Sequence, residues 1–169
     1  TATNQLSPED KVDLRQWCSP VEHQGRTNSC TANAIVAALE YHQRRSGQAQ
    51  VDLSRLFVYY NARKMAGTEG DDHGSQIHHV MASVLAHGAC EEAIWPFEPD
   101  NIPVAPPGNA YQNGSVHEAV SYARAPLGVS AMQALAAGLP VVFGTFVPGH
   151  FYQVAETTGL MPMPEEKSE

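Results

Sequence analysis

The cysteine at position 30 and the glutamine six residues before it are the residues best suited to do chemistry together. Cys30 opens an alanine-rich segment with helical spacing, and the unpaired backbone N–H groups of a helix start favour a thiolate. Gln24 can donate from its side-chain amide, and Gly25 allows the loop to fold back over the helix start. An amide and the nucleophile's own N–H form an oxyanion hole, so this spacing predicts thiol-based acyl transfer. The alternative is structural, because a cysteine among alanines is usually a small buried hydrophobe.

Three segments in the first part of the chain have helical apolar spacing and would position these residues. Residues 29–45 gather apolar side chains on one face and offer Asn28 or Ser29 as an N-cap. Residues 54–65 and 75–86 show the same 3.6-residue period. The first part of the chain is therefore predicted to be mostly helical, with the thiol at the start of its longest helix.

The later part of the chain has a different pattern. Proline and glycine crowd into residues 99–109, which predicts a boundary there. Residues 130–137 fit a short helix that ends at Gly138. Residues 139–147 are rich in β-branched and aromatic side chains between two prolines, and they predict a buried strand. The second part of the chain is therefore predicted to lean towards β-structure.

Composition excludes several classes of protein. The chain has 169 residues, a mass of 18.3 kDa and 43% hydrophobic residues, which is enough for one domain with a real core. Ten Lys and Arg against 18 Asp and Glu give a net charge of -8 without a basic run, so we expect neither nucleic acid nor a membrane as partner. No apolar stretch approaches the roughly 20 residues that span a bilayer, which predicts a soluble protein. The first residues carry no leader signal, so we expect a processed product or an excised domain, cytoplasmic or secreted.

Several motifs of the chain resemble the papain-like cysteine peptidases. Gln24-Gly25, four further residues and then Cys30 reproduce the active-site spacing of that family. Residues 53–63 are similar to the bacterial branch of the group. The motifs follow one another in the family's order, and the resemblance covers nearly the whole chain. The other matching segments are residues 12–15, 72–75, 88–97 and 139–144.

The resemblance implies an α+β, papain-like fold of two lobes. Residues 1–109 would form the N-terminal segment and the helical left lobe with the nucleophile helix, and residues 110–169 part of a β-rich, barrel-like right lobe. The implied function is a cysteine endopeptidase in which the Cys30 thiolate attacks a peptide carbonyl and Gln24 helps to hold the oxyanion. The implied partner is a peptide or protein substrate, with no cofactor. The implied substrate-binding residues are Asn28, Ser29, Gly74, Ser75 and Ile77.

The cysteines and histidines depart from a disulfide or metal framework. Thr27 stands where many secreted members of the family have a disulfide cysteine. Three cysteines leave at least one thiol free, and we expect Cys18 and Cys90 to be free structural thiols. His78 and His79 are adjacent on a predicted helix and face different sides, so no metal site is predicted.

The general base of the family is missing from the chain. The family supplies a His in a strand and an orienting Asn further on, and neither motif is present. Gly149-His150 precedes the turn at Gly159 instead of following it, so we interpret His150 as a surface loop residue. We expect the base downstream of residue 169, for example on a C-terminal fragment of the same precursor. Two alternatives stay open: a peptide-binding or regulatory module without the base, and a thiol-dependent acyl transferase.

Overall fold

The structure is a computed structural model that describes residues 11–117, 121–126 and 128–147. Within these ranges, no helix combines the length and apolarity needed to cross a membrane. The elements in chain order are η1 (Arg15–Trp17), α1 (Cys30–Arg45), α2 (Arg55–Ala66), α3 (Ile77–His87), η2 (Pro99–Asn101), α4 (Gly108–Gly114) and α5 (Val129–Ala136).

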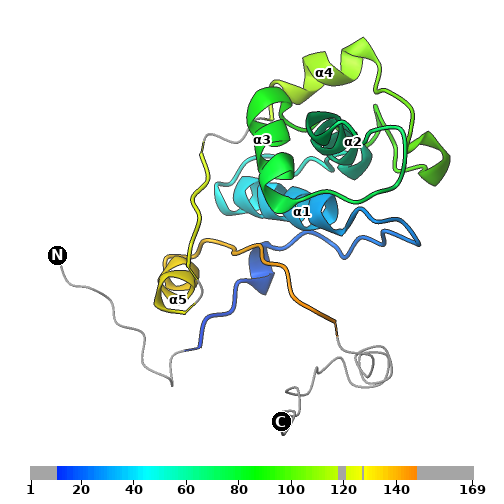
Figure 1. Ribbon diagram of the computed structural model, residues 1–169. Helices are drawn as coiled ribbons and strands as arrows, with labels where there is room; N and C mark the ends of the chain where they lie inside the picture. The colour runs from blue at the N-terminus through cyan, green and yellow to red at the C-terminus, as the bar shows by residue number, and fades with distance from the viewer. Residues whose placement is uncertain (1–10, 118–120, 127, 148–169) are drawn as a thin grey trace, which may run out of the picture.

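Helices α1, α2 and α3 pack against one another and enclose the core (Figure 1). Their bounds confirm the helices predicted from apolar spacing, and each begins within two residues of its expected start. Helix α2 contacts both of the other helices. The residues of the core with no measurable exposure are Ala32, Leu53, Leu56, Phe57, Tyr59, Ala62, Val80, Val84, Ala89, Cys90 and Ala110.

Helix α2 is buried along most of its length although it carries charged residues. The Ser54 hydroxyl caps its start by accepting the Phe57 N–H at 3.1 Å, and Gly67 ends it with a φ of 70°. Arg55, Tyr59 and Arg63 recur every four residues, so they share one face of the helix. All three are buried, and their polar groups must therefore find partners inside the protein.

The proline-rich segment leads into α4, a helix that its glycine and asparagine residues do not predict. Ala110 and Gly114 of α4 are buried, and the Asn113 side chain accepts the Glu91 N–H at 2.8 Å. These contacts hold α4 against the helical core. The predicted division of the chain after residue 109 falls within α4, and the division itself stays a prediction.

Helix α5 confirms the short helix predicted near residues 130–137. It ends at Ala136, and Gly138 follows with a φ of 75°, which is the left-handed conformation expected at that position. The Tyr41 hydroxyl donates to the Gly138 carbonyl at 2.8 Å. The end of α5 is therefore attached to α1 of the core.

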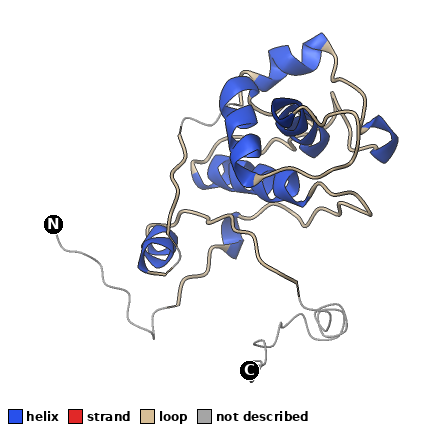
Figure 2. Cartoon of the chain, in the orientation of Figure 1, coloured by secondary structure: helices blue, strands red, loops and turns tan. Residues whose placement is uncertain are grey.

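The prediction of a buried strand at residues 139–147 is wrong, because the structure gives these residues no regular secondary structure. Figure 2 draws the described residues as helices and loops. Phe143 is 67% exposed and Phe146 is 98% exposed. A strand needs a neighbouring strand to pair its N–H and C=O groups, and the described residues offer one isolated bridge, between Leu53 and Glu91. The predicted β-rich right lobe is thus not seen in the described part of the chain.

Candidate thiol site

Cys30 is the first residue of α1, and its side chain is exposed. The preceding residue, Ser29, is buried, and its carbonyl accepts the Asn33 N–H at 3.0 Å in the first turn of the helix. The N–H groups of a first helical turn have no intrahelical partners, and they favour negative charge beside them. The thiol therefore lies where a developing anion can be stabilised.

A pocket of about 500 Å³ lies beside the thiol. The lining comes from the loop before α1 and the first residue of α1, from the end of α2 and the residue two positions after it, and from residues 73–76 with His79 of α3. Five residues expected at the site from the sequence meet here. The lining residues are Gln24, Asn28, Cys30, Ala66, Thr68, His73, Gly74, Ser75, Gln76 and His79.

Gln24 is half-buried at the edge of this pocket, in a tight turn that leads to the thiol. Its side-chain Nε2 donates to the Thr27 carbonyl at 2.7 Å, and the Thr27 hydroxyl donates back to the Gln24 carbonyl at 2.8 Å. An amide nitrogen carries two hydrogens, so one donor remains for a ligand in the pocket. The turn therefore fixes the amide and leaves it able to donate, as an oxyanion hole requires.

Two of the expected substrate-binding residues do not line the pocket. Ser29 is fully buried, and its hydroxyl contacts the Thr27 hydroxyl at 2.7 Å and accepts from Asn33 Nδ2 at 2.9 Å. Ile77 packs against the hydrophobic core at the start of α3. Both residues therefore support the site from beneath: Ser29 through its hydrogen bonds inside the loop, and Ile77 through its packing against the core.

Hydrogen bonds between residues 44 apart in the chain join the region around Cys30 to the segment that leads into α3. The Asn28 N–H lies 3.1 and 3.0 Å from the two carboxylate oxygens of Asp72, and Asn28 Nδ2 donates to the Asp72 carbonyl at 2.7 Å. The Thr31 and Ser75 hydroxyls are 2.7 Å apart. Asp72 lies in one of the segments that match the family, residues 72–75, but a polar loop residue gives no sign in the sequence of its distant partner.

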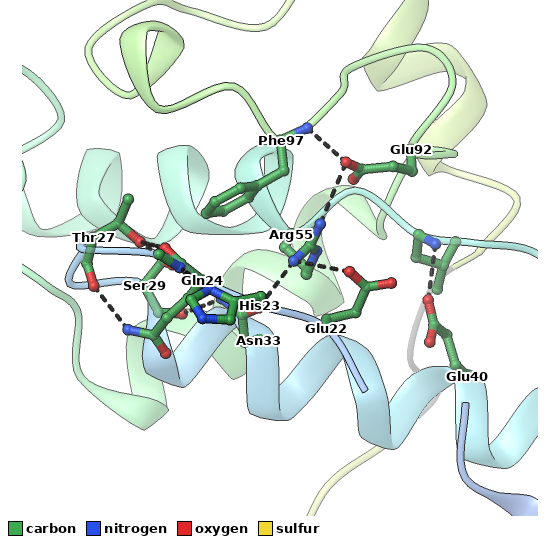
Figure 3. A network of polar contacts seen from close by, with 12 residues as sticks. Glu22, His23, Gln24, Thr27, Ser29, Asn33, Glu40, Arg55, Glu92 and Phe97 are labelled. Atoms are coloured by element: carbon green, nitrogen blue, oxygen red, sulfur yellow. Dashed lines mark hydrogen bonds and ion pairs between the residues drawn. The ribbon is translucent and has the colours of Figure 1, made fainter. Parts of the chain in front are cut away.

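A second set of polar contacts supports the loop before Cys30 from the core (Figure 3). Asn33 Nδ2 donates to both oxygens of Ser29, at 3.0 Å for the carbonyl and 2.9 Å for the hydroxyl. Arg55 of α2 donates in turn to Asn33 Oδ1 at 3.3 Å. The first turn of α1 is thus linked through Asn33 to a buried charge.

The other two thiols are free, as expected from the sequence, and they occupy different surroundings. Cys18 is exposed and Cys90 is fully buried. Burial raises the pKa of the Cys90 thiol to about 12, so this cysteine stays protonated. Cys90 is therefore part of the core, whereas Cys30 combines exposure with a pocket.

Histidines and acids do not form a metal site within the part of the chain that the structure describes, which holds no group of three possible ligands. The rings of His78 and His79 lie 4.0 Å apart, and His79 lines the pocket. His150, which the sequence suggests to be a loop residue, lies outside the described residues.

The geometry defines a thiol site at the start of α1. No family model matches the chain. An uncharacterized peptidase C1-like protein of Acanthamoeba polyphaga mimivirus is 33% identical over an alignment of 165 residues that covers 91% of this chain and 53% of that protein. The crystal structure of xylellain, a cysteine protease from Xylella fastidiosa, matches with a TM-score of 0.68 and 30% identity over 75% of this chain and 53% of xylellain.

The chain spans about half the length of each of these two proteins. A third match is procathepsin L 3 from the larval midgut of Tenebrio molitor, with a TM-score of 0.44 and 21% identity over 55% of this chain and 32% of that one. The first two matches confirm the resemblance of this chain to the papain-like cysteine peptidases. Over 75% of its length, its fold is similar to that of xylellain.

Proposed function

We propose that this chain is the nucleophile-bearing part of a cysteine endopeptidase. The observation that carries the proposal is the exposed thiol of Cys30 at the start of α1, in one pocket with the Gln24 amide. The similarity to a peptidase C1-like protein and to a cysteine protease supports it. The substrate class is a peptide or protein.

In the proposed reaction, the Cys30 thiolate forms a bond to a peptide carbonyl carbon, and the carbonyl oxygen takes the negative charge. The Gln24 amide and the Cys30 N–H hold this oxygen. The C–N bond then breaks, and the amine leaves with a proton from an imidazolium. Water gives a proton to the resulting imidazole and attacks the thioester, which releases the acid and restores the thiolate.

The imidazole of this scheme is proposed to belong to a His, oriented by an Asn, that follows residue 169. It would lie in the same polypeptide or on a C-terminal fragment of the same precursor, together with the rest of the β-rich right lobe. The support is that this chain matches only about half of the length of each of the two relatives. His73 and His79 line the pocket, but within the described residues neither hydrogen-bonds the Cys30 thiol.

The peptide would lie along the segment 73–76 in an extended form. The Gly74 N–H already donates to the Tyr59 hydroxyl at 2.9 Å. The backbone N–H and C=O of Ser75 have no such partner among the described residues. We therefore assign the pairing with the substrate backbone to Ser75, with Gly74 providing the close approach.

Cleavage of a mixed peptide library by the full protein tests the proposal, with new amino termini counted by mass spectrometry. We expect Cys30→Ala to abolish cleavage and Cys18→Ala, which removes another exposed thiol, to leave it unchanged. Cleavage that persists in Cys30→Ala would overturn the assignment of the nucleophile.

The same samples separate the two alternative functions. A wild-type protein that retains peptides on a column without cutting them would be a binding module, and the peptidase proposal would be wrong. Adding a primary amine distinguishes transfer from hydrolysis, because both start from the same thioester. We expect mainly the free acid, and a dominant amide product would instead indicate an acyl transferase.

A further inference from the structure

A tyrosine of α2 contacts two residues of the segment between α2 and α3, next to the pocket. Tyr59 of α2 is fully buried, and its hydroxyl donates to the Asp72 carboxylate and accepts the Gly74 N–H at 2.9 Å. Asp72 in turn binds Asn28. One hydroxyl in the core therefore contacts the segment 73–76 directly, at Gly74, and the loop before Cys30 through Asp72.

We propose that Tyr59, acting through Asp72, is a positioning residue that sets the spacing between the Cys30 thiol and the segment that receives the peptide. This inference rests on the proposed function. The two walls of the pocket are the nucleophile loop, with Gln24, Asn28 and Cys30, and the segment 73–76.

Tyr59 is suited to this role because it cannot move easily. The Arg63 guanidinium lies 4.2 Å from the centre of its ring, and Arg63 itself is fully buried. Arg63 donates to the carbonyls of Glu69 and Asp71 at 2.8 and 2.7 Å. The face of α2 that carries Tyr59 therefore holds the start of the same loop at two further points.

The protonation state of the hydroxyl fits its contacts. Burial, together with the hydrogen bond to Asp72, raises the pKa of Tyr59, so the group keeps its proton at all physiological pH values. A neutral hydroxyl can donate to the carboxylate and accept from the amide at the same time. The backbone of Gly74, with a φ of 77°, passes close to Asn28, so a small shift of the loop changes the pocket directly.

The test compares Tyr59→Phe with Tyr111→Phe. Both substitutions remove one hydroxyl from an aromatic ring of the core region. The Tyr111 hydroxyl donates to Asn61 Oδ1 at 2.9 Å, and neither residue lines the pocket. We expect Tyr59→Phe to lower kcat/KM for peptides about 10- to 100-fold, since small misplacements of reacting groups have such effects. We expect Tyr111→Phe to lower the melting temperature by a similar amount and to leave kcat/KM within about twofold. Equal losses of kcat/KM in the two variants would overturn the proposal.

Substitutions of Asp72 add a graded readout. Asp72→Asn keeps one acceptor oxygen for Tyr59 or Asn28, whereas Asp72→Ala keeps none. We expect Asp72→Asn to recover part of the kcat/KM that Asp72→Ala loses, and the alkylation of Cys30 by iodoacetamide to be unchanged in both. A loss of iodoacetamide labelling would show that the thiol itself has moved into the protein, and the positioning role would be wrong.

Hydrogen exchange separates this proposal from the proposed function. The Asn28 and Gly74 amides are both held by the Tyr59–Asp72 pair. We expect Tyr59→Phe to speed exchange in peptides covering residues 24–31 and 72–76, and Tyr111→Phe to leave them unchanged. This result needs no catalytic activity. Unchanged exchange in Tyr59→Phe would overturn the positioning role even in an active peptidase.

Discussion

Arg55 of α2 forms an ion pair with Glu22, whose carboxylate lies 3.1 Å from its guanidinium, two residues before Gln24. The same guanidinium lies 3.5 Å from the Glu92 carboxylate and 4.5 Å from the centre of the Phe97 ring. The Arg55 side chain is 8% exposed. A buried charge in the core thus holds the chain just before the turn that carries Gln24, and it also holds Asn33 after the thiol.

Arg55→Met tests this arrangement. The substitution keeps much of the side-chain volume but leaves Glu22 and Glu92 without their cation. Breaking a buried ion pair by removing one partner costs about 3 kcal/mol. We expect the free energy of unfolding in urea to fall by about this amount, and kcat/KM for peptides to fall as well, because the turn with Gln24 loses its anchor.

The matched control is Arg15→Met, which removes an arginine of an exposed ion pair with Asp13. Exposed pairs contribute little to stability because water and salt screen them. We expect Arg15→Met to unfold at the wild-type urea concentration. If both variants lost equal stability, the burial of Arg55 would not be the reason for its effect.

The helical half of the fold could be predicted from the sequence because its signals are local. Apolar residues at a period of 3.6 define α1, α2 and α3, and Gly138 predicts the end of α5. The spacing of Gln24 and Cys30 likewise identified two residues that share a pocket. Each of these features depends on residues close together in the chain.

Features that depend on distant partners could not be predicted. Asn28 and Asp72 are 44 residues apart, and no periodicity links a loop amide to a loop carboxylate. Ser29 looked available beside the thiol, but the contacts of its hydroxyl with Thr27 and Asn33 bury it. The prediction of a strand at residues 139–147 was wrong for the same reason, since a strand needs a neighbouring strand to pair with.

The three thiols should be distinguishable by alkylation. At pH 8 we expect iodoacetamide to label Cys18 and Cys30 in the native chain and to spare Cys90, because Cys90 is fully buried and burial raises its pKa to about 12. In denaturing urea all three should react. Peptide mapping by mass spectrometry gives the site of each label. Native labelling of Cys90 as fast as that of Cys18 would contradict its placement in the core.

The stability of the chain should carry a pH dependence from Glu40. This residue is 4% exposed, its Oε1 accepts the Leu53 N–H at 2.9 Å, and burial raises its pKa above the ordinary value of 4.5. The folded state therefore holds the proton more tightly than the unfolded state. The resulting stability is fully present below pH 4.5 and is lost as the pH rises through the folded-state pKa.

Glu40→Gln removes this titration and keeps an oxygen that can accept the Leu53 N–H. We expect the free energy of unfolding of the variant to match the wild type in acid and to exceed it increasingly as the pH rises above about 4.5. Urea titrations at a series of pH values from 4 to 8 measure the difference. Parallel curves for the two proteins would show that Glu40 does not titrate differently on folding.

The contact between Gly88 and α4 should tolerate no side chain. Gly88 has a φ of 67°, and a Cβ placed there would lie 1.9 Å from the Gly114 carbonyl oxygen. Gly88→Ala must strain the backbone and push α4 from the core, at a cost of about 3 kcal/mol. Gly47 has a similar φ of 73° with no atom near the added Cβ, so Gly47→Ala should cost only the backbone strain, about 1 kcal/mol. Urea unfolding of both variants measures the difference, and equal losses would mean that α4 does not pack on Gly88.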